Sequence, residues 1–81
     1  MSSQTERIAR ARLAINEAAQ ISNPDNAIAM LMEKAEISSG DVAGQFFSEF
    51  DDLQAYWTSI SIEKRATLLS DYLDTEAIYQ S

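Results

Sequence analysis

The chain has 81 residues, of which 46% are hydrophobic and 23% charged, and its formal net charge at pH 7 is −7. A chain of this size forms one small domain, expected here over residues 1–81, and it buries too little surface for a deep enzyme-type pocket. It contains no cysteine and no histidine, which removes disulfides, thiol nucleophiles and the usual zinc and haem ligands. We therefore expect a protein that is not an enzyme and has no catalytic residues, cofactor or metal site. The sequence lacks a membrane-length apolar run and a signal-like N-terminus, which predicts a cytoplasmic protein without membrane contact.

Charge is distributed unevenly along the sequence. Residues 1–24 contain three arginines and two glutamates, whereas residues 25–81 contain three basic and eleven acidic side chains. Between Glu36 and Glu63 there is no lysine or arginine. The negative field of this stretch should repel nucleic acid and attract a basic partner, although acidic surfaces also keep small proteins soluble without any partner.

The first helix is expected from about Ser3 to Ile21. Ser3 and Glu6 have the spacing of a capping box, and Glu6 can pair with Arg10 one turn later. Apolar residues, mostly alanines, recur at helical spacing along this segment, which predicts a thin buried face that another helix can approach closely. Residues 1–3 are expected to fray.

The second helix is expected over residues 24–36. Asn23 is a favoured N-cap, and Pro24 suits the first helical position. Met30 falls on the outer face of this helix. A complete core stripe at helical spacing is formed by Ile28, Leu31, Met32 and Ala35.

The segment that follows predicts a tight turn between two helices. Ser38 and Asp41 have capping-box spacing, and Ile37 and Val42 can form a hydrophobic staple across the cap. A new helix would then begin near Ser39 after a connection of three or four residues, as in a helix-turn-helix.

Residues 39–59 are compatible with one helix or two. The apolar positions continue at helical spacing through Ala43, Phe46, Phe50, Leu53, Trp57 and Ile60. Ser48 has N-cap spacing of its own, so a short helix that ends near Phe46 could be followed by a second helix. The aromatic side chains of this segment are expected mostly in the core. Phe47 and Met30 fit the stripes least well, and if both are exposed they would be anchors of an interface.

The last helix is expected to begin after a Ser61 cap and to end near Asp74, with residues 75–81 as a frayed tail. Its core stripe consists of Ile62, Ala66, Leu69 and Leu73. No stretch has the alternating pattern of a strand. The predicted fold class is therefore all-α, a compact bundle of four or five helices with a helix-turn-helix-like core.

The segment from Ala35 to Val42, followed by Phe46 and Leu53, resembles the helix-turn-helix of the tetracycline-repressor (TetR) family. The turn of that family typically reads Ala-Gly-Val-Ser-x-Gly, and the resemblance covers about residues 5–53. It implies a helix-turn-helix fold and, in its ordinary form, binding to DNA.

Several positions that would contact DNA in that family carry acidic or small residues here. The family's turn glycine is Glu36, a later contact position is Asp41, and the later lysine is Glu49. Ala43 and Gly44 stand at positions that are aromatic and polar in the family. A recognition helix lies between two phosphate backbones, so these changes remove contacts and add repulsion of about 1 kcal/mol for each close charge pair.

We interpret the chain as a non-enzymatic acidic protein–protein interaction module. It would be a small regulator or inhibitor of a basic, nucleic-acid-binding protein partner, including behaviour as a DNA mimic, and no direct contact with nucleic acid is expected. Whether the chain forms a homodimer stays open. The predicted partner-binding residues are Glu36, Asp41, Glu49, Asp51, Asp52, Phe47 and Met30.

The alternative interpretation is a small helix-turn-helix transcription regulator that binds DNA through the first helix's arginines, Arg7, Arg10 and Arg12, or as a dimer. Two other functions of small acidic helical proteins are disfavoured. Acyl carrier proteins need an Asp-Ser pair, which the chain lacks. A calcium loop over residues 25–36 would have Ala27 and Ala29 at ligand positions.

Overall fold

The computed structural model describes residues 3–80, and this range contains helices and connections but no strand. The all-α class is therefore confirmed, with six helices where four or five were expected. The helices are α1 (Gln4–Leu13), α2 (Ile15–Ala19), α3 (Pro24–Lys34), α4 (Asp41–Phe47), α5 (Leu53–Ser59) and α6 (Ile62–Gln80).

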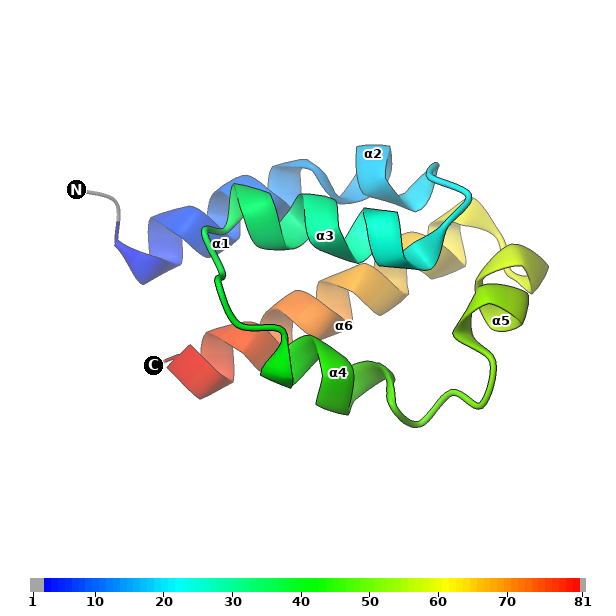
Figure 1. The fold of residues 1–81 in the computed structure, drawn as a ribbon. Helices are drawn as coiled ribbons and strands as arrows, with labels where there is room; N and C mark the ends of the chain where they lie inside the picture. Colours follow the sequence, from blue (N-terminus) through cyan, green and yellow to red (C-terminus); the bar gives the residue numbers. More distant parts are fainter. Residues whose placement is uncertain (1–2, 81) are drawn as a thin grey trace.

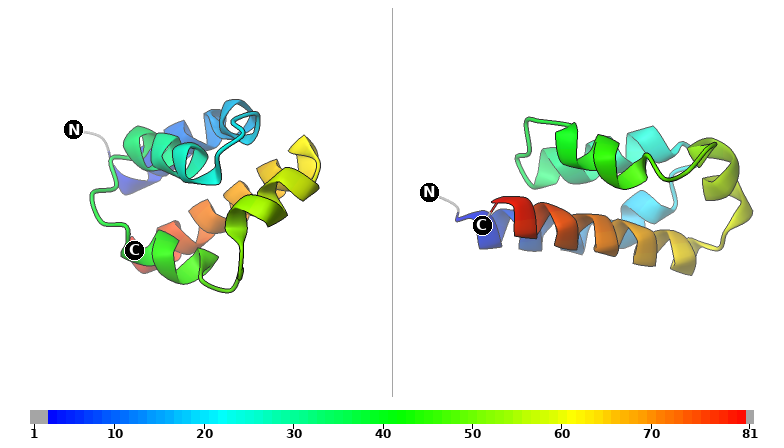
Figure 2. Two further views of the ribbon diagram at one scale, coloured as in Figure 1. Left: turned by 45° about the vertical axis from the view of Figure 1, so that its right-hand side comes forward. Right: turned by 90° about the horizontal axis from the view of Figure 1, so that it is seen from below.

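Helix α6 runs through the whole molecule and organises the others around it. Its 19 residues correspond to a length of about 28 Å, and it packs against α1, α2 and α4. Helix α3 packs against α1 and α2. After α3 the chain turns back, so that α4 runs in the opposite direction to α3 and packs against α6 (Figure 1). Helix α5 lies at the end of the molecule that is remote from both termini (Figures 1 and 2). In the described range, no helix combines the length and the apolar character that crossing a bilayer requires.

The core combines small side chains from the first helices with large side chains from the last ones. The alanine-rich face expected in the first helix is confirmed, since Ala11, Ala18 and Ala19 are completely buried. Because these side chains are short, α3 and α6 can approach α1 and α2 closely. The large, fully buried hydrophobic side chains are Leu31, Trp57, Leu69, Tyr72 and Leu73.

The first helix is interrupted at Ala14 and does not run unbroken to Ile21. The N–H of Ala14 donates to the carbonyl of Ala11 at 3.0 Å, a bond one residue shorter than in an α-helix. The cap at its start is confirmed, because the Oγ of Ser3 accepts from the N–H of Glu6 at 3.2 Å. Of residues 1–3, for which fraying is expected, Ser3 caps α1, and the other two lie outside the described residues.

Helix α3 ends in a tighter motif than the sequence indicated. The N–H of Ile37 donates to the carbonyl of Met32 at 2.9 Å, which is the long bond of a Schellman motif. This motif places Glu36 in the left-handed region, with φ 55°. Glycine is the usual residue at such a position, because a side chain there is strained.

The connection to α4 comprises residues 35–40 and is longer than the three or four residues expected. The capping box predicted for Ser38 is wrong. Gly40 occupies the N-cap without a side-chain bond, and it is the Oγ of Ser39 that accepts from the N–H of Asp41, at 3.2 Å. Ile37 and Val42 both pack partly buried against the core.

The choice between one and two helices in residues 39–59 is decided in favour of two. Ser48 ends α4 and does not begin α5, so the cap predicted there is wrong. Asp52 takes that role, because its carboxylate accepts from the N–H of Ala55 at 3.1 Å. Aspartate and serine are about equally good N-caps, so cap preference alone does not decide between the two positions.

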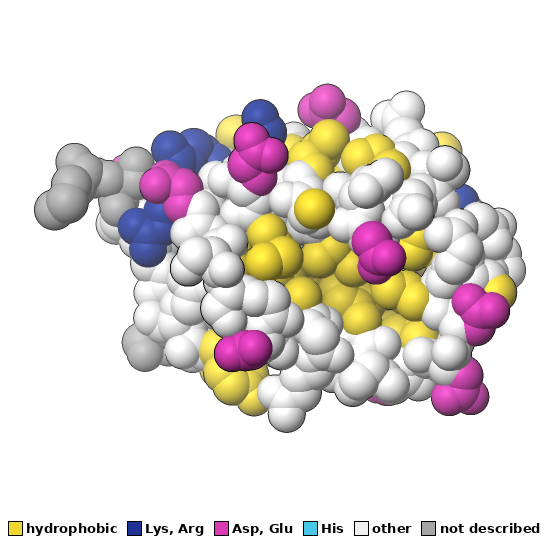
Figure 3. Space-filling view, in the orientation of Figure 1, with side chains coloured by type: hydrophobic (Ala, Val, Ile, Leu, Met, Phe, Trp, Pro, Cys, Tyr) yellow, Lys and Arg dark blue, Asp and Glu magenta, His cyan; other side chains and the backbone are white. Residues whose placement is uncertain are grey.

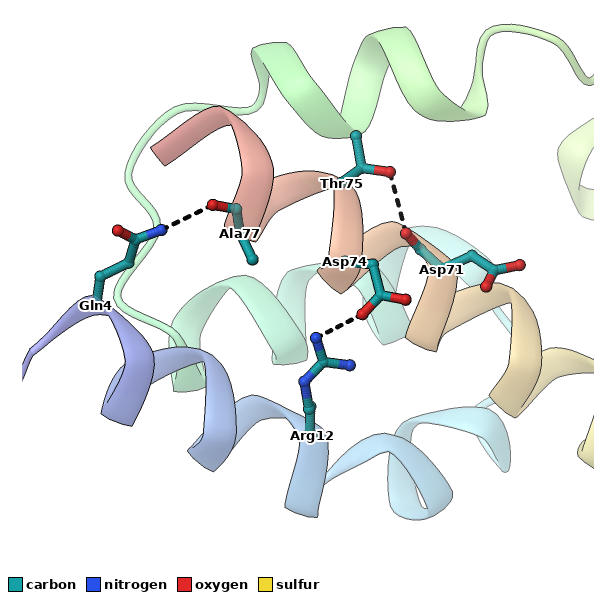
Figure 4. A network of polar contacts seen from close by, with 6 residues as sticks. All are labelled: Gln4, Arg12, Asp71, Asp74, Thr75 and Ala77. Carbon is teal, nitrogen blue, oxygen red and sulfur yellow. Dashed lines mark hydrogen bonds and ion pairs between the residues drawn. The ribbon is translucent and has the colours of Figure 1, made fainter. Parts of the chain in front are cut away.

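The last helix begins as expected, with the N–H of Lys64 donating to the Oγ of Ser61 at 3.1 Å. The prediction of a frayed tail is wrong for residues 75–80, because α6 continues to Gln80. The side-chain amide of Gln4 donates to the carbonyl of Ala77 at 3.1 Å and ties this end to α1 (Figure 4). The core position predicted for Ile62 is also wrong, since its side chain is 52% exposed.

Candidate protein-binding surface

Four of the predicted partner-binding residues form an acidic surface, which we define as Asp41, Glu49, Asp51 and Asp52. They lie at the start of α4 and in the connection between α4 and α5, and all four are exposed. Within residues 3–80, none of them forms an ion pair with a lysine or arginine. The carboxylate of Asp52 is engaged in capping α5. The other three acidic groups are uncompensated and face solvent, so their field extends into it.

Glu36, the fifth acidic residue predicted to bind a partner, differs from these four because its charge is paired within the chain. Its carboxylate forms an ion pair with the guanidinium of Arg10 across α1 and the end of α3. The pairing predicted between Glu6 and Arg10 within α1 is therefore wrong. A partner that uses Glu36 would first have to break its internal pair.

Another arginine of the first helix is also engaged inside the chain. A guanidinium nitrogen of Arg12 lies 2.5 Å from a carboxylate oxygen of Asp74 on α6 (Figure 4). The two cross-helix pairs, Arg10 with Glu36 and Arg12 with Asp74, involve exposed groups. They compensate the charges of two arginines of α1.

Arg65 has a structural role next to the core. Its guanidinium lies 5.0 Å from the centre of the Trp57 ring and donates to the carbonyls of Trp57 at 2.9 Å and Ala19 at 3.1 Å. The indole N–H of Trp57 in turn donates to the carbonyl of Ile21 at 2.8 Å. This network attaches α5 to the end of α2 and the start of α6.

Neither of the two apolar residues predicted to bind a partner is exposed. Phe47 is only 8% exposed, and its ring lies 4.9 Å from that of Phe46 and 5.4 Å from that of Tyr72. Met30 is half-buried and packs against the core. Helix α6 supplies the surface that covers Phe47, and the pattern of α4 alone could not indicate it.

An apolar groove, which we call the α3–α4 groove, opens between α3, α4 and the start of α5. Its volume is about 210 Å³. In the space-filling view, apolar side chains are visible in a band between α3 and α4, with acidic side chains around it and most of the visible basic ones at the α1 end (Figure 3). The groove is lined by Asp25, Ile28, Ala29 and Met32 of α3, Ala43, Gly44 and Phe47 of α4, and Leu53 of α5.

Sequence reasoning missed a buried carboxylate, Glu76, because it lay in the expected tail. Glu76 is 1% exposed and borders a cavity of about 500 Å³ between the α3–α4 connection and the end of α6. Its carboxylate accepts from the hydroxyl of Tyr72 at 2.9 Å and from the side-chain amide of Gln80 at 2.7 Å. The spacing of Leu69, Tyr72, Leu73 and Glu76 continues one helical stripe, and this signal could have placed it inside.

Burial raises the pKa of the Tyr72 hydroxyl well above its ordinary value, and the hydrogen bond to Glu76 and the charge of Glu76 raise it further. The phenol therefore stays protonated and keeps donating to the carboxylate. Every buried side-chain polar atom of the described residues has a hydrogen-bond partner. The Tyr72–Glu76 pair is a satisfied structural pair.

The described residues contain no group of three or more acidic side chains placed to hold a metal ion. Comparisons of the chain with family models, with curated proteins and with solved structures gave no match. The resemblance to the TetR-family helix-turn-helix therefore stays a prediction from the residues.

Proposed function

We propose that this protein is a non-enzymatic interaction module that binds a basic protein partner through the acidic surface. The observation that carries the proposal is that exposed acidic side chains lie in a segment, residues 41–59, that contains no lysine or arginine. Arg10 and Arg12 are paired inside the chain, whereas Asp41, Glu49 and Asp51 have no cationic partner within residues 3–80. Unpaired surface charges of one sign steer a partner of opposite charge and speed its association.

A basic patch on the partner is most often built to bind nucleic acid, because phosphate contacts require clusters of lysine and arginine. An acidic module on that patch would compete with nucleic acid for the same side chains. The proposed role is therefore a regulator or inhibitor that acts as a DNA mimic.

The experiment compares two charge-reversed variants of equal net charge. In the test variant, Asp41, Glu49 and Asp51 are changed to lysine, and Asp52 is kept because it caps α5. In the control variant, three exposed acids elsewhere are changed to lysine: Glu17, Glu63 and Asp71. Circular dichroism establishes that both variants fold.

Wild type and both variants are immobilised and exposed to a cell extract, and retained proteins are identified by mass spectrometry and purified for titration. We expect wild type and control to retain the same basic protein, with an affinity that falls as salt rises, and the test variant to lose it. Equal retention by all three would contradict a role for the acidic surface.

The alternative is a DNA-binding regulator that uses the α1 arginines. It predicts retention of the free protein on heparin or duplex DNA at about 50 mM salt, where non-specific DNA binding is strong. The proposed function predicts that the protein elutes without retention. Salt-sensitive binding to duplex DNA would favour the alternative.

A further inference from the structure

We propose that the α3–α4 groove receives an apolar side chain of a basic amphipathic helix in the partner protein. This inference rests on the proposed function and specifies the part of the partner that is bound. Three features of the groove support it: its size, its charge surroundings and the glycine in its wall.

The size of the groove suits one large side chain better than a small-molecule ligand. Pockets for drug-sized ligands measure about 300–1,000 Å³, whereas this groove measures about 210 Å³. Ile28 and Phe47, each 8% exposed, contribute buried apolar surface to it, and Leu53 at one side is half-buried. Amphipathic helices bind such grooves by inserting apolar residues from one face.

The charges around the groove specify a basic helix. Asp25 lines the groove itself, and Asp52 immediately precedes Leu53, another lining residue. The remaining acidic surface lies at both ends of α4, the helix that forms one wall. A helix with lysine or arginine beside its apolar face would place those cations near these carboxylates when its apolar residue is inserted.

No contact or backbone angle within residues 3–80 requires glycine at position 44. It lies in the interior of α4, where glycine is less favourable than alanine. Its φ is not positive, so the backbone does not need glycine there. A Cβ at this position would meet no atom within 4 Å, so packing inside the chain does not need it either.

Because Gly44 lines the groove, the missing side chain leaves room for a second backbone to come close to α4. Ala29 and Ala43, the neighbouring lining residues, are also small. Short side chains at a contact allow two helices to pack at the low end of the usual interaxial distances, which are about 8–10 Å.

The test uses two fluorescein-labelled peptides of about 16 residues, enough for four helical turns. Both contain only leucine and lysine in equal proportion, with leucine on one helical face in the first peptide and spread around the helix in the second. Binding to the full chain is measured by fluorescence anisotropy.

Two variants of the protein accompany wild type. Gly44→Leu adds a large side chain to the wall of the groove, at a position where its Cβ meets no neighbouring atom within 4 Å. Thr67→Leu adds apolar bulk to an exposed position of α6 outside the groove and is the control. Thermal unfolding shows that both variants remain folded at the temperature of the binding assay.

We expect wild type and Thr67→Leu to bind the first peptide about tenfold or more tightly than the second. Gly44→Leu should reduce that difference to less than about twofold while it keeps the weaker, charge-driven binding of both peptides. A preference that survives Gly44→Leu would overturn the groove as the binding site.

The experiment distinguishes a failure of the groove inference from a failure of the proposed function. Equal binding of both peptides, lost when Asp41, Glu49 and Asp51 are changed to lysine, would overturn the groove inference and leave the proposed function standing. Binding of neither peptide would overturn both. Sedimentation of wild type as a dimer that Gly44→Leu converts to a monomer would overturn the partner helix in favour of a second copy of this chain.

Discussion

Two regions of the molecule are stabilised in different ways. The body, consisting of α1, α2, α3 and α6, has helices that pack closely through small buried side chains and are joined by two cross-helix ion pairs. The segment of residues 41–59 contains α4 and α5, which have seven residues each. Isolated helices shorter than about 12–15 residues are marginal in water, so α4 and α5 depend on their contacts with the body.

Aromatic side chains make several of these contacts. The ring centres of Phe46 and Phe47 lie 6.0 and 5.4 Å from that of Tyr72 on α6. Trp57 is completely buried, and its indole N–H donates to the carbonyl of Ile21. A few large anchors hold this segment in place, and the rest of its surface carries acidic residues and the open groove. The region that is least able to fold without contacts to the rest of the chain therefore carries the acidic surface and one wall of the groove.

The strongest test of this dependence is Trp57→Ala. The side chain is 0% exposed and its N–H is bonded to the carbonyl of Ile21. Truncation of a buried aromatic side chain leaves a cavity and costs about 3–5 kcal/mol. We expect a loss of that size in the free energy of unfolding, measured by urea titration with circular dichroism.

Tyr56→Ala is the control, because the neighbouring side chain is only half-buried and should cost less. A loss below about 1 kcal/mol for Trp57→Ala would mean that residues 41–59 are held by other contacts.

Within the body, the second-largest effect is expected for Tyr72→Phe. The change removes the hydroxyl that donates to the buried carboxylate of Glu76 and leaves one oxygen without that donor. An unsatisfied buried acceptor costs about 1–3 kcal/mol, so unfolding should become easier by that amount. Tyr79→Phe, at a 61% exposed position, should change the unfolding free energy by less than about 0.5 kcal/mol.

Because of the same hydroxyl group, we expect the folded protein to lose stability in alkali. The pKa of Tyr72 is raised in the folded protein by burial and by Glu76, whereas in the unfolded chain it has its ordinary value near 10. Above that pH the unfolded chain releases the proton and the folded protein keeps it, so the unfolding free energy falls, by at most about 1.4 kcal/mol per pH unit.

Urea titrations at several pH values between neutrality and about 11.5 measure this slope. Tyr72→Phe should have a shallower slope above about pH 10, because the residue that titrates is gone. Identical slopes in both proteins would contradict the raised pKa.

Local signals in the sequence were sufficient for most of the body. Ser3, Asn23 and Ser61 each accept backbone hydrogen bonds at the helix starts where they were predicted. Capping acts within one turn, so neighbouring residues determine it. Two helix boundaries in the body differ from the prediction, the break at Ala14 and the continuation of α6 past Asp74. The end of α6 is tied to α1 by the bond between Gln4 and Ala77, which joins residues 73 positions apart and leaves no local signal.

Residues 41–59 could be predicted only in part. Ser48 and Asp52 are competing caps, and nothing local decides between them. Phe46 and Phe47 are adjacent and point about 100° apart on a helix, so the position of α6 determines which of them is buried. The acidic surface followed from the charge run, whereas the groove joins residues of α3 and α4 that lie far apart in the sequence.

A smaller effect, in the stabilising direction, is expected for Gly44→Ala. Alanine is favoured over glycine in a helix interior by about 1 kcal/mol, and the added methyl group meets no neighbour. We expect the unfolding free energy to rise by about 0.5–1 kcal/mol. A loss of stability would show that the fold itself requires the glycine, and it would remove the argument that Gly44 is there for a partner.

The smallest effect is expected for the ion pair between α1 and α6. The side chains of Arg12 and Asp74 are 38% and 56% exposed, so water and salt screen their attraction. Exposed pairs of this kind contribute about 0.2–1 kcal/mol. A double-mutant cycle with Arg12→Gln and Asp74→Asn, measured by urea titration, should give a coupling energy in that range at low salt and close to zero at about 1 M salt.

A coupling well above 1 kcal/mol that persists at high salt would show that the body depends on its charges as strongly as residues 41–59 depend on their aromatic anchors. The statement that the body is stabilised by close packing through small side chains would then be wrong.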